Sequence, residues 1–290
     1  MTGYVPGQVL GRTVTLGSLR LGVVDAAGVA WRVAAGRLPG WDGPSVRSQY
    51  TDREADHGAW AGPTYAGARV ITVAGTVVAP DLSALDAAVE QLLAAAAFED
   101  TLLVVGETIP KQTTVRRSGE PLIEYETDRI ARYSVLLTSA DPWRYSTVLQ
   151  SGPPVGLPVA GTGISVPLTV PVTIPAGAAA GSIVLTNAGS APARPAFTVR
   201  GPTAGGFTIL VTTGTTIRQL TYADSLLAGE QLVIDTDRHT VILGGAVSRR
   251  RYLSGQWPQV PAGQTATVTW SCPTYHSAAQ LTASLRSAWL

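Results

Sequence analysis

The chain contains one cysteine, Cys272, among 290 residues. A single thiol cannot build an intrachain disulfide framework, and it cannot build a multi-cysteine zinc or iron–sulfur site. We therefore expect Cys272 to be a buried thiol without a chemical role.

Charged residues are also scarce. They make up 14% of the chain, and the formal net charge is only +1. This composition argues against a basic nucleic-acid binder and against a protein kept disordered by its charge. Lys111 is the only lysine among the 21 basic residues, which we attribute to GC-rich coding rather than to function.

Targeting and membrane segments are not evident. The first seven residues have neither the basic region nor the apolar core of a secretory signal, so we expect synthesis in a cytoplasm. The longest uncharged apolar stretch, Val166 to Leu185, is interrupted by Pro167, Pro171 and Pro175. Prolines at this density break a spanning helix, so we expect no membrane insertion.

The clearest structural signal is a strand followed by a helix. Residues Arg69–Val78 are β-branched and partly alternating, which indicates a strand. After Pro80 the apolar spacing changes to three and four residues, which predicts an amphipathic helix from Asp81 to Ala97, capped by Asp81 or Ser83. Its apolar positions are Leu82, Leu85, Val89, Leu92 and Leu93, of which we expect Leu85, Val89 and Leu92 to point inward.

Other segments of the first half carry strand and turn signals. Thr13–Leu16 and Leu19–Val23 are separated by Gly17-Ser18, a two-residue hairpin signal. Residues Thr51–Gly67 are polar and aperiodic, which indicates a long functional or interface-forming loop. Lys111–Arg117 is a polar, Thr-rich strand or arm.

The length predicts two domains, since domains average about 150 residues. Tyr145 to Ala193 contains no charged residue and many prolines and glycines, which is typical of a connector with edge strands. We expect an N-terminal domain at residues 1–147, a connector at 148–182, with Ile164–Ile174 against a folded surface, and a C-terminal domain at 183–290. The C-terminal part alternates in short strands without helices, which predicts an antiparallel β-sandwich.

Catalytic motifs are not found: the chain has no phosphate-binding glycine loop, nucleophile elbow or paired-histidine metal motif. Two acidic clusters are candidates for a metal site or a general base, but a solvated loop or an exposed charged face is the favoured interpretation of both. The first is Asp52, Glu54, Asp56 and His57; the second is Glu124, Glu126 and Asp128, which an extended chain would place on one face.

Three further sets of residues resemble binding sites. Asp235 and Asp237 resemble a calcium or sugar-nucleotide pair, but a hairpin turn also favours Asp at these positions. Arg249-Arg250-Arg251 would need flanking aromatic residues and a basic face to bind phosphate, so we favour a solvated edge or a subunit contact. Tryptophans could stack on sugars, although core or interface packing is commoner; they include Trp41, Trp60, Trp257, Trp270 and Trp289. We therefore assign no catalytic, cofactor-binding or metal-binding residue, and we expect no cofactor.

Taken in order, three segments of the chain resemble the distal tail proteins of long-tailed bacteriophages, the siphophage tail-tip and baseplate family, in the form found in phages of GC-rich actinobacterial hosts. The segments are Leu38–Gly43 (LPGWDG), the Arg69–Val78 strand with the Asp81–Ala97 helix, and Asn187–Pro195 (NAGSAPARP). The resemblance spans nearly the full length.

The resemblance implies a mainly β structural protein without catalytic activity. Residues 1–147 would form a barrel-like belt domain with one packed helix, and residues 183–290 a galectin-like sandwich for adhesion. The protein would assemble in the host cytoplasm and lie at the virion tail tip as a homohexameric ring. Its partners would be the tail tube protein and the tail hub; the tape-measure protein, a receptor-binding protein and a host saccharide are further candidates, and nucleic acid is not. We assign Thr51–Gly67 and Lys111–Arg129 as arms between subunits.

Two alternatives belong to other functional classes. One is a host-glycan-binding module, in which the C-terminal sandwich itself recognises a cell-wall sugar. The other is a cell-wall glycan hydrolase that uses carboxylates such as Glu124 or Asp128, and we regard it as the less favoured of the two.

Overall fold

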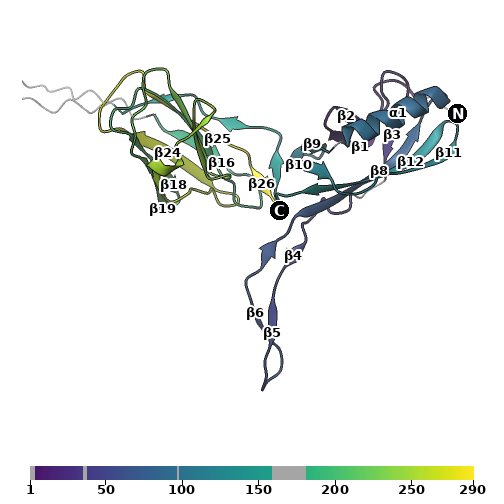
Figure 1. Cartoon of the computed structure of the whole chain (residues 1–290), viewed down its shortest axis with the longest axis horizontal. Coiled ribbons are helices and arrows are strands. Elements are labelled where there is room, and N and C mark those ends of the chain that lie inside the picture. The colour runs from purple at the N-terminus through teal and green to yellow at the C-terminus, as the bar shows by residue number, and fades with distance from the viewer. Residues whose placement is uncertain (1–3, 35–37, 97, 159–180) are drawn as a thin grey trace, which may run out of the picture. The chain divides into compact units, whose positions relative to one another are not determined.

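The computed structural model describes residues 4–34, 38–96, 98–158 and 181–290. In these residues the chain consists mainly of antiparallel β-strands, with one α-helix and one short 3-10 helix (Figure 1). The predicted mainly β fold with a single packed α-helix is therefore confirmed. The chain divides into two compact units: unit 1 runs to Thr147 and includes Leu290, and unit 2 covers Val148–Trp289.

Unit 1 is built on one large antiparallel sheet. Its strands follow the order β2-β1-β9-β10-β12-β8-β3, with β11 paired to β12 and β13 paired to β10. The sheet curves so that its two end strands, β2 and β3, contact each other. The elements are β1 Val9–Leu16, β2 Leu19–Val23, β3 Ala30–Val33, β4 Val46–Arg47, β5 Tyr50–Asp52, β6 Ala59–Ala61, β7 Tyr65–Ala66, β8 Arg69–Val78, α1 Leu82–Ala95, β9 Thr101–Val105, β10 Lys111–Arg117, β11 Leu122–Thr127, β12 Ile130–Ser139 and β13 Arg144–Ser146.

Helix α1 covers the core of unit 1. Of the two candidate caps, Asp81 is the one used: its side chain accepts a hydrogen bond from the backbone N–H of Ala84 at 2.8 Å. Leu85, Val89 and Leu92 are buried, as predicted. Each such side chain stabilises the fold by about 1.5–3 kcal/mol through loss of contact with water. Leu82 is half exposed and does not belong to the inward face, and Ala97 lies outside the described residues.

The hairpin predicted around Gly17-Ser18 is confirmed. β1 and β2 pair with Leu16 opposite Leu19, and both of these leucines are buried. Gly17 has a φ of 58°, a left-handed conformation that glycine adopts without a steric cost.

Two expectations for the first half are corrected. Thr51–Gly67 is not an irregular loop, because it belongs to a two-stranded hairpin in which β4 pairs with β7 and β5 with β6. Lys111–Arg117 is a strand, which confirms one of its two predicted states, but the assignment of Lys111–Arg129 as an arm is wrong for this part. β10 lies inside the main sheet between β9 and β12 and buries Thr113 and Val115. Only β11 of the predicted second arm lies at an edge. We call residues 45–67 the arm.

Arg69, the first residue of β8, holds the base of the arm. It is fully buried, and its guanidinium donates hydrogen bonds to the carbonyl oxygens of Gly40 (3.1 Å), Trp41 (2.6 Å) and Pro142 (2.6 Å). Burial, together with the nearby charge of Arg144, lowers the pKa of Arg69 to about 10, so the group stays protonated at neutral pH. Because Trp41 precedes the arm and Arg69 follows it, one side chain joins the two ends of the arm.

Unit 2 contains two antiparallel sheets. One has the order β14-β25-β17-β20-β21-β22 with β15 paired to β25, and the other has the order β16-β24-β18-β19-β23. The strands and the 3-10 helix η1 are β14 Gln150–Ser151, β15 Val155–Gly156, β16 Ile183–Thr186, β17 Ala196–Arg200, β18 Phe207–Thr213, β19 Thr216–Tyr222, β20 Gln231–Asp235, β21 Thr240–Leu243, β22 Val247–Ser248, η1 Arg250–Tyr252, β23 Leu253–Gly255, β24 Thr265–Ser271, β25 Gln280–Leu285 and β26 Ala288–Trp289.

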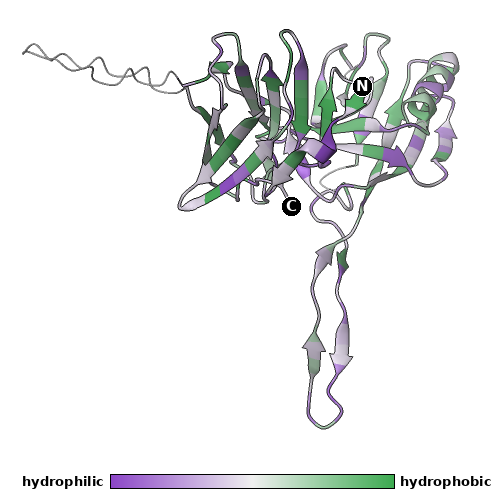
Figure 2. Ribbon diagram, turned by 60° about the vertical axis from the view of Figure 1, so that its left-hand side comes forward, coloured by the Kyte–Doolittle hydropathy of each residue, from purple (hydrophilic) through white to green (hydrophobic). Residues whose placement is uncertain are grey.

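The strands of unit 2 bury alternate side chains, as the period-two pattern predicts. Phe197 and Val199 of β17 and Ile209 and Val211 of β18 all lie in its core, and Figure 2 shows the hydrophobic residues concentrated in the strands of both units. β19 is a strand that the alternating pattern does not predict, because its burial alternates only over its last residues. Of the predicted connector, the residues 159–180 that include Ile164–Ile174 lie outside the described residues.

No helix in the described part of the chain is long and apolar enough to cross a membrane.

The turn before the arm requires glycine at position 40 but not at position 43. Gly40 has a φ of 82°, and a Cβ added there would lie 1.6 Å from the carbonyl oxygen of Val70. We expect Gly40→Ala to lower the free energy of unfolding by at least about 2 kcal/mol. Gly43, in the same turn, has open space at its Cβ position, so Gly43→Ala should change it by less than about 0.5 kcal/mol. Urea denaturation measures both; equal effects would contradict this account of the turn.

Arg69 gives a second prediction. Arg69→Met keeps most of the apolar stem but leaves three carbonyl oxygens without their donor, and we expect a loss of about 3 kcal/mol in the free energy of unfolding. Arg20→Met, at an exposed position in β2 of the same sheet, is the matched control and should lose less than about 0.5 kcal/mol. Similar denaturation midpoints for the two variants would show that the buried hydrogen bonds of Arg69 do not hold unit 1 together.

Candidate functional site

The arm is the most exposed part of unit 1. Its two ladders pair Val46 with Ala66 and Tyr50 with Ala61. Between the ladders, the backbone N–H of Gly62 donates to the carbonyl oxygen of Gln49 at 2.8 Å, and at the base the N–H of Gly67 donates to the carbonyl oxygen of Ser45 at 2.7 Å. Figure 1 shows the hairpin leaving the sheet between the turn before β4 and the start of β8. A two-stranded hairpin is marginally stable on its own in water, so the arm gains stability when its faces are covered.

Four large side chains on the arm are exposed to solvent. Val46, Tyr50, Trp60 and Tyr65 are between 61% and 66% exposed. Tyrosine and tryptophan are the residues most often found to dominate binding energy at protein interfaces. An exposed apolar group of this kind, on a segment without a core of its own, indicates an interaction surface.

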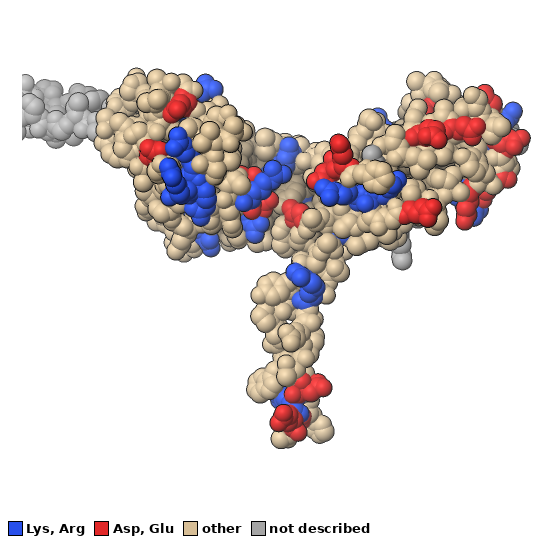
Figure 3. All heavy atoms as spheres, viewed as in Figure 1, with Lys and Arg blue, Asp and Glu red and all other residues tan. Residues whose placement is uncertain are grey.

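The tip of the arm carries the first acidic cluster. Arg53 lies over the ring of Trp60, 4.5 Å from its centroid, and pairs with Asp56 at 3.6 Å. Figure 3 shows acidic and basic groups together at the tip, below a mostly uncharged shaft. Asp52 lies in β5 whereas Glu54 and His57 lie in the turn. Among the described residues, no group of three or more His, Cys, Asp or Glu side chains is placed to hold a metal ion.

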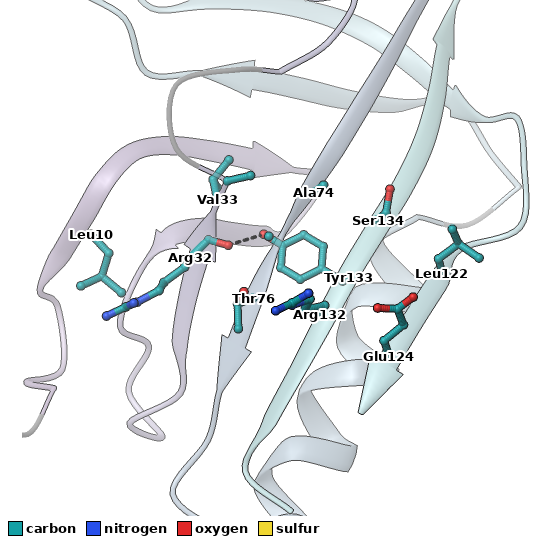
Figure 4. Close-up of a pocket in the computed structure, with 12 residues that line it drawn as sticks. Leu10, Arg32, Val33, Ala74, Thr76, Leu122, Glu124, Arg132, Tyr133 and Ser134 are labelled. Carbon is teal, nitrogen blue, oxygen red and sulfur yellow. Dashed lines mark hydrogen bonds between the residues drawn. The ribbon is translucent and has the colours of Figure 1, made fainter. Parts of the chain in front are cut away.

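A hollow of about 700 Å³ lies on the outer face of the sheet formed by β3, β8, β12 and β11. Figure 4 shows its lining, in which Arg32, Arg132 and Glu124 are the charged residues. Beneath it, Tyr133 reaches across β8 and donates a hydrogen bond to the carbonyl oxygen of Arg32 at 3.0 Å. Gly75 permits this crossing, because a Cβ there would lie 2.6 Å from the Tyr133 oxygen. Burial raises the pKa of Tyr133, so the phenol remains a neutral donor.

The second acidic cluster is divided between the edge strand β11 and the turn that follows it. Glu124 lines the hollow, Glu126 pairs with Arg132 at 2.6 Å, and Asp128 lies in the turn after β11. The pairing of β11 with β12 shifts register between Tyr125 and Thr127, and Glu124 lies directly opposite Arg132. Because Glu126 pairs with the same arginine, Glu124 and Glu126 lie on the side of Arg132, as predicted, and only Asp128 is outside the strand. Glu124 is the only carboxylate among the described residues lining the hollow, whereas glycoside hydrolysis commonly needs two facing carboxyl groups.

Glu107 is the centre of a half-buried charge cluster in unit 1. It accepts a hydrogen bond from the indole N–H of Trp41 at 2.6 Å and pairs with Lys111, while Arg144 lies 3.9 Å away. Burial opposes ionisation of Glu107, but the hydrogen bonds from Lys111 and Trp41 and the charges of Lys111 and Arg144 hold its pKa below the usual range. Trp41, Lys111 and Arg144 all contact the Glu107 carboxylate. We therefore interpret the cluster as one that holds the fully buried Trp41 in place, not as a ligand site.

The remaining sequence candidates lie apart from one another. Asp235 accepts hydrogen bonds from the backbone N–H groups of Asp237 and Arg238 at 2.9 and 3.0 Å, as a turn requires, and Asp237 pairs with Arg194 at 2.6 Å. Cys272 is half-buried rather than buried. Burial raises the pKa of its thiol to about 11, which makes it a poor nucleophile at neutral pH.

The tryptophans do not form one sugar-binding platform. Trp41 and Trp270 belong to the cores of different units, and Trp60 is on the arm. Trp257 is the centre of a cluster that sequence reasoning missed: His239 stacks on its ring at 4.5 Å and Arg250 lies 4.9 Å from its centroid. Arg249 and Arg251 lie over Tyr252 in the same way. In the sequence, the only indication of this cluster is that Tyr252 and Trp257 follow the arginine run closely.

Comparison with known proteins gives a match in structure alone. No protein-family model and no curated protein matches the chain. Among solved structures, the Dit protein (gp 19.1) of phage SPP1, described as a paradigm of the hub adsorption apparatus in phages that infect Gram-positive hosts, aligns with a TM-score of 0.64 and 11% identity. The alignment covers 96% of this chain and 99% of that chain.

A second solved structure is similar over the same extent. A chain of the phage P2 baseplate, in its activated conformation with Ca, aligns with a TM-score of 0.50 and 8% identity over 95% of this chain and 98% of that chain. At such low identity the likeness establishes the fold and nothing beyond it. The chain therefore has the fold of SPP1 Dit over nearly its whole length.

Proposed function

We propose that this chain is a structural protein of a phage tail tip, which forms a ring of identical subunits, six in number, between the tail tube and the central hub. The observation that carries the proposal is the exposed arm, set on the fold of SPP1 Dit. Unit 1 is the ring-forming belt in this proposal, and unit 2 is the outer, galectin-like sandwich displayed for adhesion.

The arm supports a ring in physical terms. A cyclic ring is held by a heterologous interface, in which one surface of each subunit meets a different surface of the next. A hairpin anchored at its base by Arg69 and exposed along its length is suited to reach a neighbour. Its tyrosines and tryptophan would become buried there, which supplies the apolar contact that the arm lacks in one chain.

The position of β10 inside the sheet changes which segments we assign to subunit contacts. Deleting residues 111–129 would remove β10 from inside the sheet, so this deletion tests folding rather than assembly. We keep the arm at 45–67 and the exposed edge strand β11 as the contact segments.

The other parts of the proposal follow from the resemblance. The tail tube protein and the tail hub are the proposed neighbours along the tail, with the tape-measure and receptor-binding proteins as further partners and an actinobacterial host. We propose no catalytic activity. A hydrolase built on Glu124 has no second carboxylate among the described residues lining that hollow, and Asp128 lies in a separate turn.

The mass of the purified assembly tests the ring. We expect mass photometry to give six times the 30.1 kDa of one chain. Averaged images of virion tail tips that carry a gold label on unit 2 should show the label arranged around a ring below the tube. A monomer in solution together with unlabelled tail tips would contradict the proposed function.

The arm's role gives a separate prediction. Trp60→Ser and Tyr65→Ser remove exposed rings, so we expect the monomer to keep its denaturation midpoint while the ring dissociates at concentrations at least about tenfold higher than for the wild type. Tyr275→Ser is the matched control, because Tyr275 is a similarly exposed ring (52%) in unit 2. Mass photometry over a dilution series measures the difference. Rings that survive dilution equally well in all variants would show that the arm does not join subunits.

A further inference from the structure

The core of unit 2 becomes polar at the turn between β18 and β19. Along the inner face of β19, Tyr222 and Leu220 are buried, but the next two positions on that face are Arg218 and Thr216. Arg218 lies opposite Val211 of β18, and Thr216 opposite Thr213. A guanidinium and two hydroxyls therefore continue the line of apolar core side chains toward solvent.

These side chains line a hollow of about 240 Å³ within unit 2. Its polar lining consists of Thr213, Thr216, Arg218, Gln259 and Gln264. Four of the five are neutral groups that both donate and accept hydrogen bonds, and the fifth is a permanent cation. The volume is below the usual range of about 300–1,000 Å³ for drug-sized ligands, so it suits one small polar unit.

Arg218 is fixed in place without being neutralised. Its Nη1 donates a hydrogen bond to the carbonyl oxygen of Trp257 at 2.8 Å. In the described residues no carboxylate forms an ion pair with Arg218, which differs from Arg194, Arg249 and other arginines of the chain. A guanidinium has five N–H donors, so one held by a single carbonyl has donors left for an anion in the hollow.

Trp257 connects Arg218 to a neighbouring cluster that contains a second arginine, Arg250. Trp257, whose carbonyl holds Arg218, is packed against His239 and Arg250. Arg250 is itself held by a hydrogen bond to the carbonyl oxygen of Leu253 at 2.8 Å. The ring of Trp257 is thus in contact with the His239 imidazole and the Arg250 guanidinium, so it is not a free platform for stacking.

We propose that this hollow, lined by Thr213, Thr216, Arg218, Gln259 and Gln264, binds one anionic sugar unit of a glycan. Arg218 pairs with the carboxylate or phosphate of the sugar, and the threonine and glutamine side chains bond to its hydroxyls. The inference rests on the proposed adhesive role of unit 2 for its biological setting, but the site does not require the ring.

The lining favours a sugar over other anionic ligands. A free inorganic anion accepts hydrogen bonds but donates few or none, so it would leave the acceptor oxygens of the four neutral side chains unused, whereas sugar hydroxyls both donate and accept. Single-stranded nucleic acid is bound by free aromatic faces along a continuous basic groove, whereas here the ring of Trp257 is engaged and Asp224 lies beside Arg249 at 3.7 Å. The mixture of one cation with several neutral hydrogen-bonding groups matches a hydroxylated ligand that carries one negative charge.

Calorimetric titration of the full chain tests the inference. The probes are trigalacturonate for the carboxylate, glucose 6-phosphate for the phosphate, maltotriose as a neutral sugar, inorganic phosphate and a single-stranded oligonucleotide. We expect at least one anionic sugar to bind at least about tenfold more tightly than maltotriose and than phosphate, because charge-assisted hydrogen bonds are roughly twice as strong as neutral ones.

Variants locate the site. Arg218→Gln should weaken binding of the anionic sugar at least tenfold, and Thr216→Val, at an exposed position, should weaken it several-fold without loss of fold. Arg200→Gln, at an exposed position in β17, is the matched control and should bind as the wild type does. Thermal unfolding confirms that each variant is folded.

The contradicting results are equally specific. Absence of binding by both anionic sugars, equal binding by maltotriose or phosphate, tighter binding of the oligonucleotide, or unchanged binding by folded Arg218→Gln and Thr216→Val would each overturn the inference. Mass photometry of the same samples separates this outcome from the proposed function, because a ring that binds no anionic sugar refutes the site alone.

Discussion

Arg69 is the residue on which the organisation of unit 1 depends. A buried guanidinium loses its contact with water, and here it is compensated by the carbonyl oxygens of Gly40, Trp41 and Pro142. Those three carbonyls lie before the arm and after β12, so the same contact closes the base of the arm and ties it to the sheet. Trp41 is fixed in turn by Glu107. The arm is exposed along its length, but the buried hydrogen bonds of Arg69 fix its base to the sheet.

In the proposed ring, this arrangement would assign the folding core and the subunit contact to different parts of unit 1. The sheet and α1 bury the core and need nothing from a partner, whereas the arm has its apolar side chains in solvent. Contact residues carried on a rigid base lose less freedom on binding than those on a flexible loop. Unit 2 has its own core and a polar hollow lined by Arg218, so the proposed adhesion and the proposed assembly would use different surfaces.

The sequence predicted the parts of the fold that are buried on one face. Leu85, Val89 and Leu92 are spaced for a helix against a core, and Phe197 and Val199 alternate because one face of β17 is buried. The arm could not be predicted, because both of its faces are exposed and its pattern has no period. β19 was missed for a related reason, since its inner face becomes polar at Arg218 and Thr216.

The candidate sites were harder to predict than the fold. Spacing alone placed Glu124, Glu126 and Asp128 on one face of a strand; Glu124 and Glu126 do lie together beside Arg132, but β11 ends before Asp128, which lies in the turn. The cluster at Trp257 joins His239, Arg250 and Arg218 from three elements, which no local pattern reveals.

The central claim is that the arm binds a second copy of the chain. Photo-cross-linking from a benzophenone side chain at position 60, in an equal mixture of ¹⁴N- and ¹⁵N-labelled chains, tests it most directly. We predict cross-linked peptides in which an arm of one isotope is joined to unit 1 of the other. Cross-links confined to one isotope would contradict the claim.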